Sequence, residues 1–223
     1  MIPKIIWQTH ELPYEELPDF QKDIINTWKN LNPDWEHQYV DAQERSKQVK
    51  EYDDLLHSYY LLVGKINQAD IWRLVVIYQN GGIYADMDSV CINSITEAIR
   101  WNYKEEDMMC SRKGFQSNGI NNSNFGGVKG SKIIKLMLDS LIVKYSKYTL
   151  EELLSLQVGD PTNGLFSKIA EENKEFIFFN SKYFDHTEIY KKKFDRDIEV
   201  TVNGQKMEYS LLCKNNDWPI YYI

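Results

Sequence analysis

The sequence predicts an α/β fold with a mixed sheet flanked by helices. In the first half of the 223-residue chain, short β-branched runs alternate with segments whose apolar residues recur at helical spacing. In the second half, two short runs flank Asn203-Gly204, a strong signal for a hairpin with a type I′ turn. With 43% hydrophobic residues, the chain can form one domain with a sizeable core.

The first half is expected to contain three short strands and a series of helices. The β-branched run 4–7 predicts a strand followed by a loop at Gln8-Thr9-His10. Asp19 and Asp41 are candidate N-caps, and Asn80-Gly81-Gly82 is a left-handed helix stop. The further strands expected are 35–40 and 83–85, and the helices are 19–31, a region after Asp41, and 64–79.

The second half gives weaker signals. The segment 114–127 is rich in Gly, Asn and Ser and predicts a loop long enough to suspect function. Thr149 and Glu152 form a candidate capping box at the start of a helix. The other elements expected are strands at 107–111 and 176–179, helices at 132–145 and from 162 or 163 to 172, and a C-terminal hairpin over 197–209 followed by a tail.

Charge and cysteine content exclude several classes of protein. The net charge of −7 leaves no basic footprint for nucleic acid. Cys91, Cys110 and Cys213 show neither metal-ligand spacing nor an even disulfide set, which favours reduced thiols in a cytoplasmic protein. We recognise no signal peptide and no apolar window long enough for a membrane helix. The run 191–193 of lysines is expected to be solvated, with a membrane-surface patch as the alternative.

Two carboxylates at the end of an apolar strand are the main candidate site. Asp86 and Asp88 follow the strand 83–85, and residues two apart in an extended segment face the same side. A solvated turn is the plain alternative, but open α/β sheets bind ligands at the carboxyl ends of their strands. A divalent cation carrying a diphosphate would compensate both charges, which is the chemistry of a nucleotide-sugar site.

Asp70 and Arg73 are a second candidate pair. They lie three residues apart on the predicted helix 64–79, so a weak surface ion pair is one interpretation. The other is that Asp70 accepts hydrogen bonds from sugar hydroxyls while Arg73 neutralises phosphate or holds the sugar, a task that suits its planar fork of donors.

Three motifs together resemble a known family. Ile5-Ile6-Trp7-Gln8-Thr9, Ala69-Asp70-Ile71-Trp72-Arg73 and the segment 81–88, in this order and separation, resemble the glycosyltransferases with the DXD-containing sugar-binding region (family 32). That family includes yeast-type initiating α-1,6-mannosyltransferases and bacterial capsule or polysaccharide transferases, and the clostridial glucosylating toxins carry a similar set. The resemblance covers residues 2–92.

The resemblance implies a GT-A fold, Mn²⁺ or Mg²⁺, and a retaining transfer of a hexose from a nucleotide-sugar donor, with a UDP-sugar favoured over GDP-mannose. The roles it implies are base stacking by Trp7, for which a core position is the alternative, sugar contacts by Asp70 and Arg73, ribose and sugar contacts by Asp86, and metal ligation by Asp86 and Asp88. Gln8, Asn67 and Tyr84 are further candidate substrate-binding residues, and Asp70, Arg73 and Asp86 are the candidate catalytic residues.

The C-terminal tail fits the family less well. Trp218 matches an aromatic residue that closes over the diphosphate, with Asn216 where a Ser is usual. Cys213 falls where a further metal ligand would be, and a thiolate suits Mg²⁺ or Mn²⁺ poorly. The Gly159-Asp160-Pro161 turn would line the acceptor side or simply initiate a helix.

The sequence thus predicts one glycosyltransferase domain, with residues 1–92 as the nucleotide-sugar half and 93–223 as the acceptor half and C-terminal lid. Polysaccharide or glycoconjugate synthesis is the expected role, with a glycan, lipid-linked or protein acceptor. The expected location is the cytoplasm, with peripheral association at the inner face of the membrane left open. A metal-dependent phosphoesterase and a non-catalytic subunit that binds nucleotide-sugar or glycan are the rival interpretations.

Overall fold

The protein is built on one mixed six-stranded sheet. The computed structural model describes residues 1–91, 94–100, 106–112, 120–156, 162–179, 199–202, 205–208 and 221–222. The strand order is β2-β1-β3-β6-β5-β7, in which β1 pairs in parallel with β2 and β3, β5 pairs in parallel with β7, and β6 runs antiparallel to both of its neighbours. The strands are β1 (Ile5–Thr9), β2 (Glu36–Val40), β3 (Gly82–Ala85), β5 (Met108–Arg112), β6 (Ile120–Gly127) and β7 (Ile177–Phe179).

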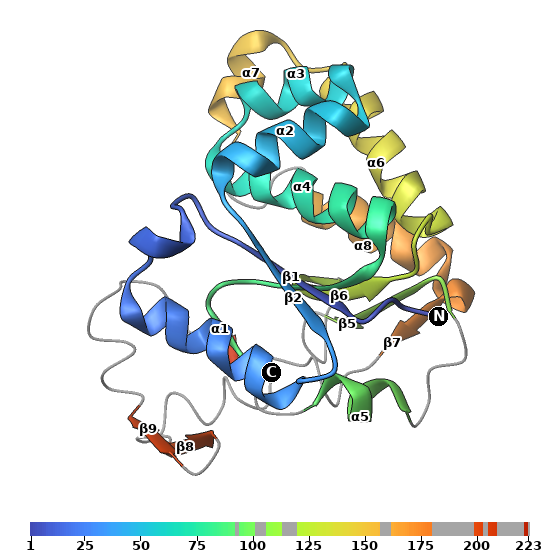
Figure 1. The fold of residues 1–223 in the computed structure, drawn as a ribbon. Helices are drawn as coiled ribbons and strands as arrows, with labels where there is room; N and C mark the ends of the chain where they lie inside the picture. The colour runs from blue at the N-terminus through green and yellow to red at the C-terminus, as the bar shows by residue number, and fades with distance from the viewer. Residues whose placement is uncertain are drawn as a thin grey trace.

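Helices cover both faces of this sheet (Figure 1). One face carries α2 (Ala42–Tyr52), α3 (Asp54–Leu62), α4 (Lys65–Asn80), α6 (Lys132–Tyr145), α7 (Leu150–Ser155) and α8 (Thr162–Glu172). The other face carries α1 (Asp19–Leu31) and α5 (Ile95–Arg100). Short 3₁₀ turns form at Tyr14–Glu16 and Lys174–Phe176. No helix in these described ranges combines the length and apolarity needed to cross a bilayer.

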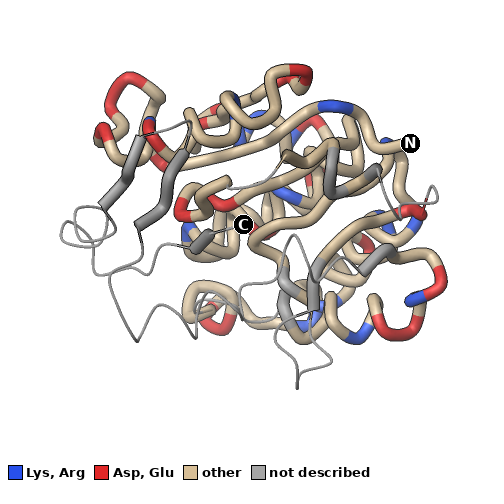
Figure 2. Tube along the Cα trace, turned by 90° about the horizontal axis from the view of Figure 1, so that it is seen from below, with Lys and Arg blue, Asp and Glu red and all other residues tan. Residues whose placement is uncertain are grey.

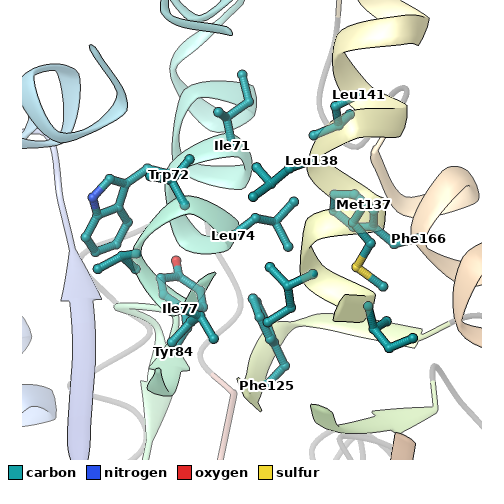
Figure 3. Packing of buried hydrophobic residues seen from close by; sticks show 14 of the residues in the cluster. Ile71, Trp72, Leu74, Ile77, Tyr84, Phe125, Met137, Leu138, Leu141 and Phe166 are labelled. Carbon is teal, nitrogen blue, oxygen red and sulfur yellow. The ribbon is translucent and has the colours of Figure 1, made fainter. Parts of the chain in front are cut away.

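The strand β3 divides the core into two parts because its side chains alternate between the sheet faces. Tyr84 belongs to the larger cluster, in which α4 packs between the sheet and α6 (Figure 3). Ile83 belongs to the second cluster, together with Trp28 of α1 on the opposite face. Both clusters are thus anchored on the strand that ends at the Asp-x-Asp pair.

The connection from α4 to β3 depends on two glycines. Gly81 has a φ of 71° and ends α4, as the left-handed stop predicted. Gly82 has a φ of 110°, and a Cβ added there would lie 2.5 Å from Ile5 O and 3.0 Å from Trp7 Nε1. The close approach of β3 to β1 therefore requires a residue without a side chain.

The helix predictions are confirmed for α1, α4, α6, α7 and α8. Asp41 caps α2 and the Thr149–Glu152 capping box starts α7, both as predicted. The region after Asp41 is two helices, because the Asp53 side chain accepts from Leu56 N and starts α3. Asp19, in contrast, is the first residue of α1 rather than its cap, which is Pro18.

Three strand predictions need correction. Gln8 and Thr9 belong to β1, so the predicted loop begins later. Residues 120–127 of the predicted loop form β6, while 113–119 lie outside the described residues. The C-terminal hairpin forms, as β8 (Glu199–Val202) and β9 (Gln205–Glu208), but it is a separate two-stranded sheet, and β6 makes the main sheet mixed.

We expect Gly82→Ala to destabilise the protein by about 1–3 kcal/mol from the positive φ alone, with more from the clash against β1. Gly164→Ala is the control, because nothing lies within 4 Å of a Cβ at that exposed position in α8. The control should stabilise by about 0.5–1 kcal/mol, since Ala is the better helix former. Urea denaturation of both variants is the measurement; equal midpoints would contradict this account of the β1–β3 contact.

Candidate active site

The Asp-x-Asp pair lies at the mouth of a cavity of about 540 Å³. This cavity is at the carboxyl ends of β1, β2 and β3, where parallel strands place ligands. Its lining residues are Thr9, His10, Glu11, Phe20, Gln21, Ile24, Arg45, Lys65, Ile66, Ala69, Arg73, Tyr84, Asp86, Met87 and Asp88. A volume in the usual range for small-molecule sites makes it the candidate active site.

Asp86 is held by two side chains from neighbouring elements. The Tyr84 hydroxyl donates to Asp86 Oδ1 at 2.5 Å, and Arg73 Nη2 lies 3.4 Å from the same oxygen. The Arg73 guanidinium also stacks over the Tyr84 ring, 4.5 Å from its centroid. The first acid of the motif is therefore fixed in place, while the half-buried Asp88 also lines the cavity.

Asp70 and Arg73 form a buried pair, which excludes the surface interpretation. Asp70 is 3% exposed and Arg73 4%, and Arg73 Nη2 lies 2.9 Å from Asp70 Oδ1. Asn122 of β6 completes the contact, because its Nδ2 donates to Asp70 Oδ1 at 3.2 Å and its carbonyl accepts from Arg73 Nη1 at 2.5 Å. Arg73 lines the cavity, and Asp70 orients it from behind.

Burial and mutual charge set the ionisation of this cluster. Burial opposes the charge of Arg73, but the carboxylate of Asp86, followed by further acidic neighbours, outweighs it and raises the pKa of Arg73. Burial raises the pKa of Asp86, and the charge of Arg73 and the Tyr84 hydroxyl partly offset this. Burial likewise raises the pKa of Tyr84 well above its usual value. The tyrosine therefore stays a neutral donor.

The turn that carries the two acids is supported from below by Gln8 and His37. The Gln8 amide donates to Asp86 O at 3.4 Å, and its Oε1 lies 2.7 Å from His37 Nε2. Gln8 is fully buried and is not among the cavity-lining residues. It therefore contacts the backbone of the motif rather than the cavity. Burial, followed by the charge of Lys29, lowers the pKa of His37 to about 4, so the ring is neutral at pH 7.

Trp7 and Asn67 lie in the protein interior. Trp7 is 8% exposed, its indole N–H donates to Gly81 O at 2.9 Å, and its ring meets Trp72 edge to face at 6.4 Å. Asn67 Nδ2 donates to Leu156 O at 3.4 Å. Neither residue is among those lining the cavity, so the placement of Trp7 favours the core alternative over base stacking.

The end of the chain reaches the strand that follows Asp88. The two-residue strands β4 (Ser89–Val90) and β10 (Tyr221–Tyr222) pair in parallel. The predicted lid residues Asn216 and Trp218, the position of Cys213 and the Gly159-Asp160-Pro161 turn lie outside the described residues. Their roles stay predictions.

The described side chains fit a hard divalent cation held partly by its substrate. Asp86 and Asp88 supply oxygen ligands at the cavity wall. Within the ranges described, no group of three or more His, Cys, Asp or Glu residues could hold a metal by itself. Mg²⁺ and similar ions are commonly bound by one or two carboxylates plus substrate phosphates, which matches this donor set.

A mixed sheet flanked by helices, with an acidic turn and a buried arginine at its carboxyl edge, is the arrangement of the GT-A glycosyltransferases. Residues 18–110 match the family model described as the glycosyltransferase sugar-binding region containing a DXD motif. The chain therefore carries this sugar-binding region and belongs with the glycosyltransferases that contain it. The matched region includes α4 and the Asp-x-Asp turn but begins after Trp7.

Relatives with this region are named as sugar-transferring enzymes. The chain is 29% identical over 104 residues to the initiation-specific alpha-1,6-mannosyltransferase of Candida albicans, an alignment that covers 44% of this chain and 27% of that protein. It is 24% identical over 208 residues to inositol phosphoceramide mannosyltransferase 2 of Schizosaccharomyces pombe, which covers 90% of this chain and 56% of that protein. The chain thus spans between about a quarter and just over half of their lengths.

A solved structure supports the fold. The PaToxG glycosyltransferase aligns with a TM-score of 0.53 at 15% identity, over 77% of this chain and 68% of that one. At this identity the likeness concerns the fold, and it confirms the GT-A type predicted from the sequence.

Sequence reasoning missed Asn122 and His37. Asn122 was assigned to a loop because of its polar, glycine-rich surroundings, and His37 was interpreted only as a surface or satisfied residue. The alternation on β2 gives no warning that His37 meets Gln8, because that contact depends on the pairing of β2 with β1.

We expect Trp7→Ala to lower the free energy of unfolding by about 3–5 kcal/mol, because a buried Trp would be lost from the core. Base stacking would instead contribute about 1–3 kcal/mol to nucleotide binding. Denaturant unfolding and nucleotide titration on the same preparation separate the two. A stable variant that no longer binds nucleotide would restore the stacking role implied by the family resemblance.

We expect His37 to make the protein less stable as the pH falls from 6.5 to about 4, because its lowered pKa means that the unfolded chain binds the proton first. The loss is at most about 3 kcal/mol, given 1.36 kcal/mol per pKa unit. His37→Gln keeps a donor toward Gln8 and removes the titration, so it should show a flatter profile. Unfolding free energies at pH 7, 5.5 and 4.5 test this; parallel profiles would exclude His37 as the cause.

Proposed function

We propose that this protein is a metal-dependent, retaining glycosyltransferase that moves a hexose from a nucleotide-diphosphate sugar to an acceptor hydroxyl. The observation that carries the proposal is the cavity in which Asp86, Asp88 and the buried Arg73 meet at the carboxyl edge of a GT-A-type sheet. Acidic and basic groups adjoin there, which suits a ligand that combines a cation with a diphosphate.

Arg73 is the proposed holder of the donor sugar and its phosphate. Its guanidinium is fixed by Asp70, Asn122 O and Asp86, so it needs no rearrangement when charge develops on the leaving diphosphate. Asp70 positions Arg73 and would reach the sugar hydroxyls, while Asp86 would contact the ribose and sugar. These three are the proposed catalytic and sugar-binding residues.

Asp88, with Asp86, is the proposed holder of a divalent cation, either Mn²⁺ or Mg²⁺. A bound cation of this kind supplies Lewis-acid stabilisation of the departing diphosphate. Because Asp86 Oδ1 is already engaged by Tyr84 and Arg73, Asp88 would be the principal ligand, with the diphosphate completing the shell.

Retention is proposed through attack of the acceptor on the donor face that the diphosphate leaves. No pair of carboxylates in the described cavity is arranged as a covalent nucleophile with its partner, because Asp86 Oδ1 is tied to Arg73. Residues 1–92 would supply the donor half, and 93–223 the acceptor half and a lid that includes Asn216 and Trp218.

Polysaccharide or glycoconjugate synthesis in the cytoplasm is the proposed setting, with a glycan, lipid-linked or protein acceptor. No nucleic-acid partner is proposed, since Lys and Arg are interspersed with Asp and Glu along the described trace (Figure 2). Association with the inner face of the membrane would be peripheral.

We expect Asp88→Asn to abolish metal-dependent binding of the donor while the fold is retained, because one ligand charge is lost at a half-buried turn. Titration calorimetry of UDP-glucose and GDP-mannose, with Mn²⁺ and with EDTA, is the measurement. Asp23→Asn, on the exposed side of α1, removes the same charge away from the cavity and should bind like the wild type.

Unchanged affinity in Asp88→Asn would remove the metal role. Donor hydrolysis followed on the same preparations addresses catalysis. Tight, metal-dependent donor binding without any turnover, with or without acceptor sugars, would favour the non-catalytic nucleotide-sugar-binding subunit instead.

A further inference from the structure

The cavity continues from the Asp-x-Asp turn to a second group of charged side chains. At the carboxyl ends of β1 and β2 it is lined by Glu11, Arg45 and Lys65, which come from the loop after β1, from α2 and from the first residue of α4. None of them contacts Arg73, Asp86 or Asp88 in the ion pairs found for these residues. This end of the cavity therefore has its own chemistry.

Arg45 is buried and incompletely satisfied. It is 1% exposed, its Nη1 donates to Thr9 Oγ1 at 3.1 Å, and its Nη2 pairs with Glu11. Its Nε has no hydrogen-bond partner although the side chain lines the cavity. A buried N–H without an acceptor is costly, so an oxygen of a bound ligand is the natural partner.

Glu11 places an acceptor beside this donor. Its carboxylate pairs with Arg45 through Oε1 and lies 3.7 Å from Lys65 Nζ through Oε2. Two cations keep it ionised, and 30% of its side chain is still exposed. The subsite thus presents a fixed N–H donor next to a charged acceptor that remains accessible.

A phosphate fits this pattern poorly, because it offers acceptors and no donor and would face the Glu11 charge. A ring with a carbonyl beside an N–H satisfies both groups: the carbonyl accepts from Arg45 and the N–H donates to Glu11. Uracil and guanine present such an edge, whereas cytosine and adenine place an unprotonated ring nitrogen at that position.

We propose that Arg45 and Glu11 form the base-recognition subsite of this cavity, and that it selects nucleobases in which a carbonyl lies beside a ring N–H. The inference rests on the proposed function, because it assumes that the diphosphate lies at Asp86 and Asp88. It assigns recognition of the base to hydrogen bonding at Arg45 and Glu11.

The test is titration calorimetry of UDP, GDP, CDP and ADP, each with Mn²⁺, on the wild type, Glu11→Gln and Glu16→Gln. In the wild type, UDP or GDP should bind about 10-fold more tightly than CDP and ADP. In Glu11→Gln this preference should fall below about 3-fold, because an amide can donate to the unprotonated ring nitrogen. Glu16→Gln removes the same charge at an exposed position outside the cavity and should keep the wild-type preference.

Arg45→Lys is the second variant, since a lysine keeps the charge and lacks the Nε–H fork. It should weaken UDP and GDP more than CDP and ADP, with thermal melting used to confirm that the variant is folded. Inorganic phosphate serves as a competitor that occupies phosphate sites alone, and it should not alter the preference among bases.

The outcomes separate the two levels of the argument. Metal-dependent binding of all four nucleotides with equal affinity overturns the base-recognition subsite and leaves the proposed function standing. A wild-type preference that persists in Glu11→Gln also overturns it. Absence of binding by every nucleotide overturns the proposed function, and this inference with it.

Discussion

The buried guanidinium of Arg73 is the constraint on which the site is built. A charge that is 4% exposed is tolerated only when opposite charges and hydrogen-bond acceptors surround it. Asp70 supplies one from the same helix, Asp86 another from the turn after β3, and Asn122 O a third from β6. Loss of one partner from such a buried cluster costs about 3–5 kcal/mol, so these three elements are locked to one another.

This locking also explains why the two acids of the motif are not equivalent. Tyr84 and Arg73 both address Asp86 Oδ1, so the position of that carboxylate is set before any ligand arrives. Gln8 fixes the same residue from the backbone side, and Ser89 N donates to Asp86 O at 3.1 Å. A preorganised polar site needs little reorganisation when charge develops, which is the main way in which such sites stabilise transition states.

Features that depend on local chemistry could be predicted from the sequence. The left-handed stop after α4, the Asp41 cap and the Thr149–Glu152 capping box all use hydrogen bonds within a few residues. The Asp-x-Asp pair and the Asp70–Arg73 spacing were likewise legible, because strand and helix periodicity place each pair on one side. The contacts of Gln8 with His37 and of Arg73 with Asn122 join residues 29 and 49 positions apart and depend on strand pairing.

The one strand mistaken for a loop, β6, shows why local composition fails at this site. Its glycines are required by packing, because a Cβ at Gly126 would lie 2.2 Å from Ile83 Cδ1 and one at Gly127 would lie 2.7 Å from Ile134 Cδ1. Its asparagines are required by the site: Asn122 reaches Asp70, and Asn124 Nδ2 donates to Ser89 Oγ at 3.1 Å.

A central strand is normally rich in β-branched and aromatic residues, and β6 gives up that preference at both ends. The sheet compensates through the backbone, since β6 pairs with β3 on one side and β5 on the other. Local preference and overall fold thus disagree on this strand at the point where the second half of the chain meets the candidate active site. Such disagreement is expected where function, rather than stability, selects the residues.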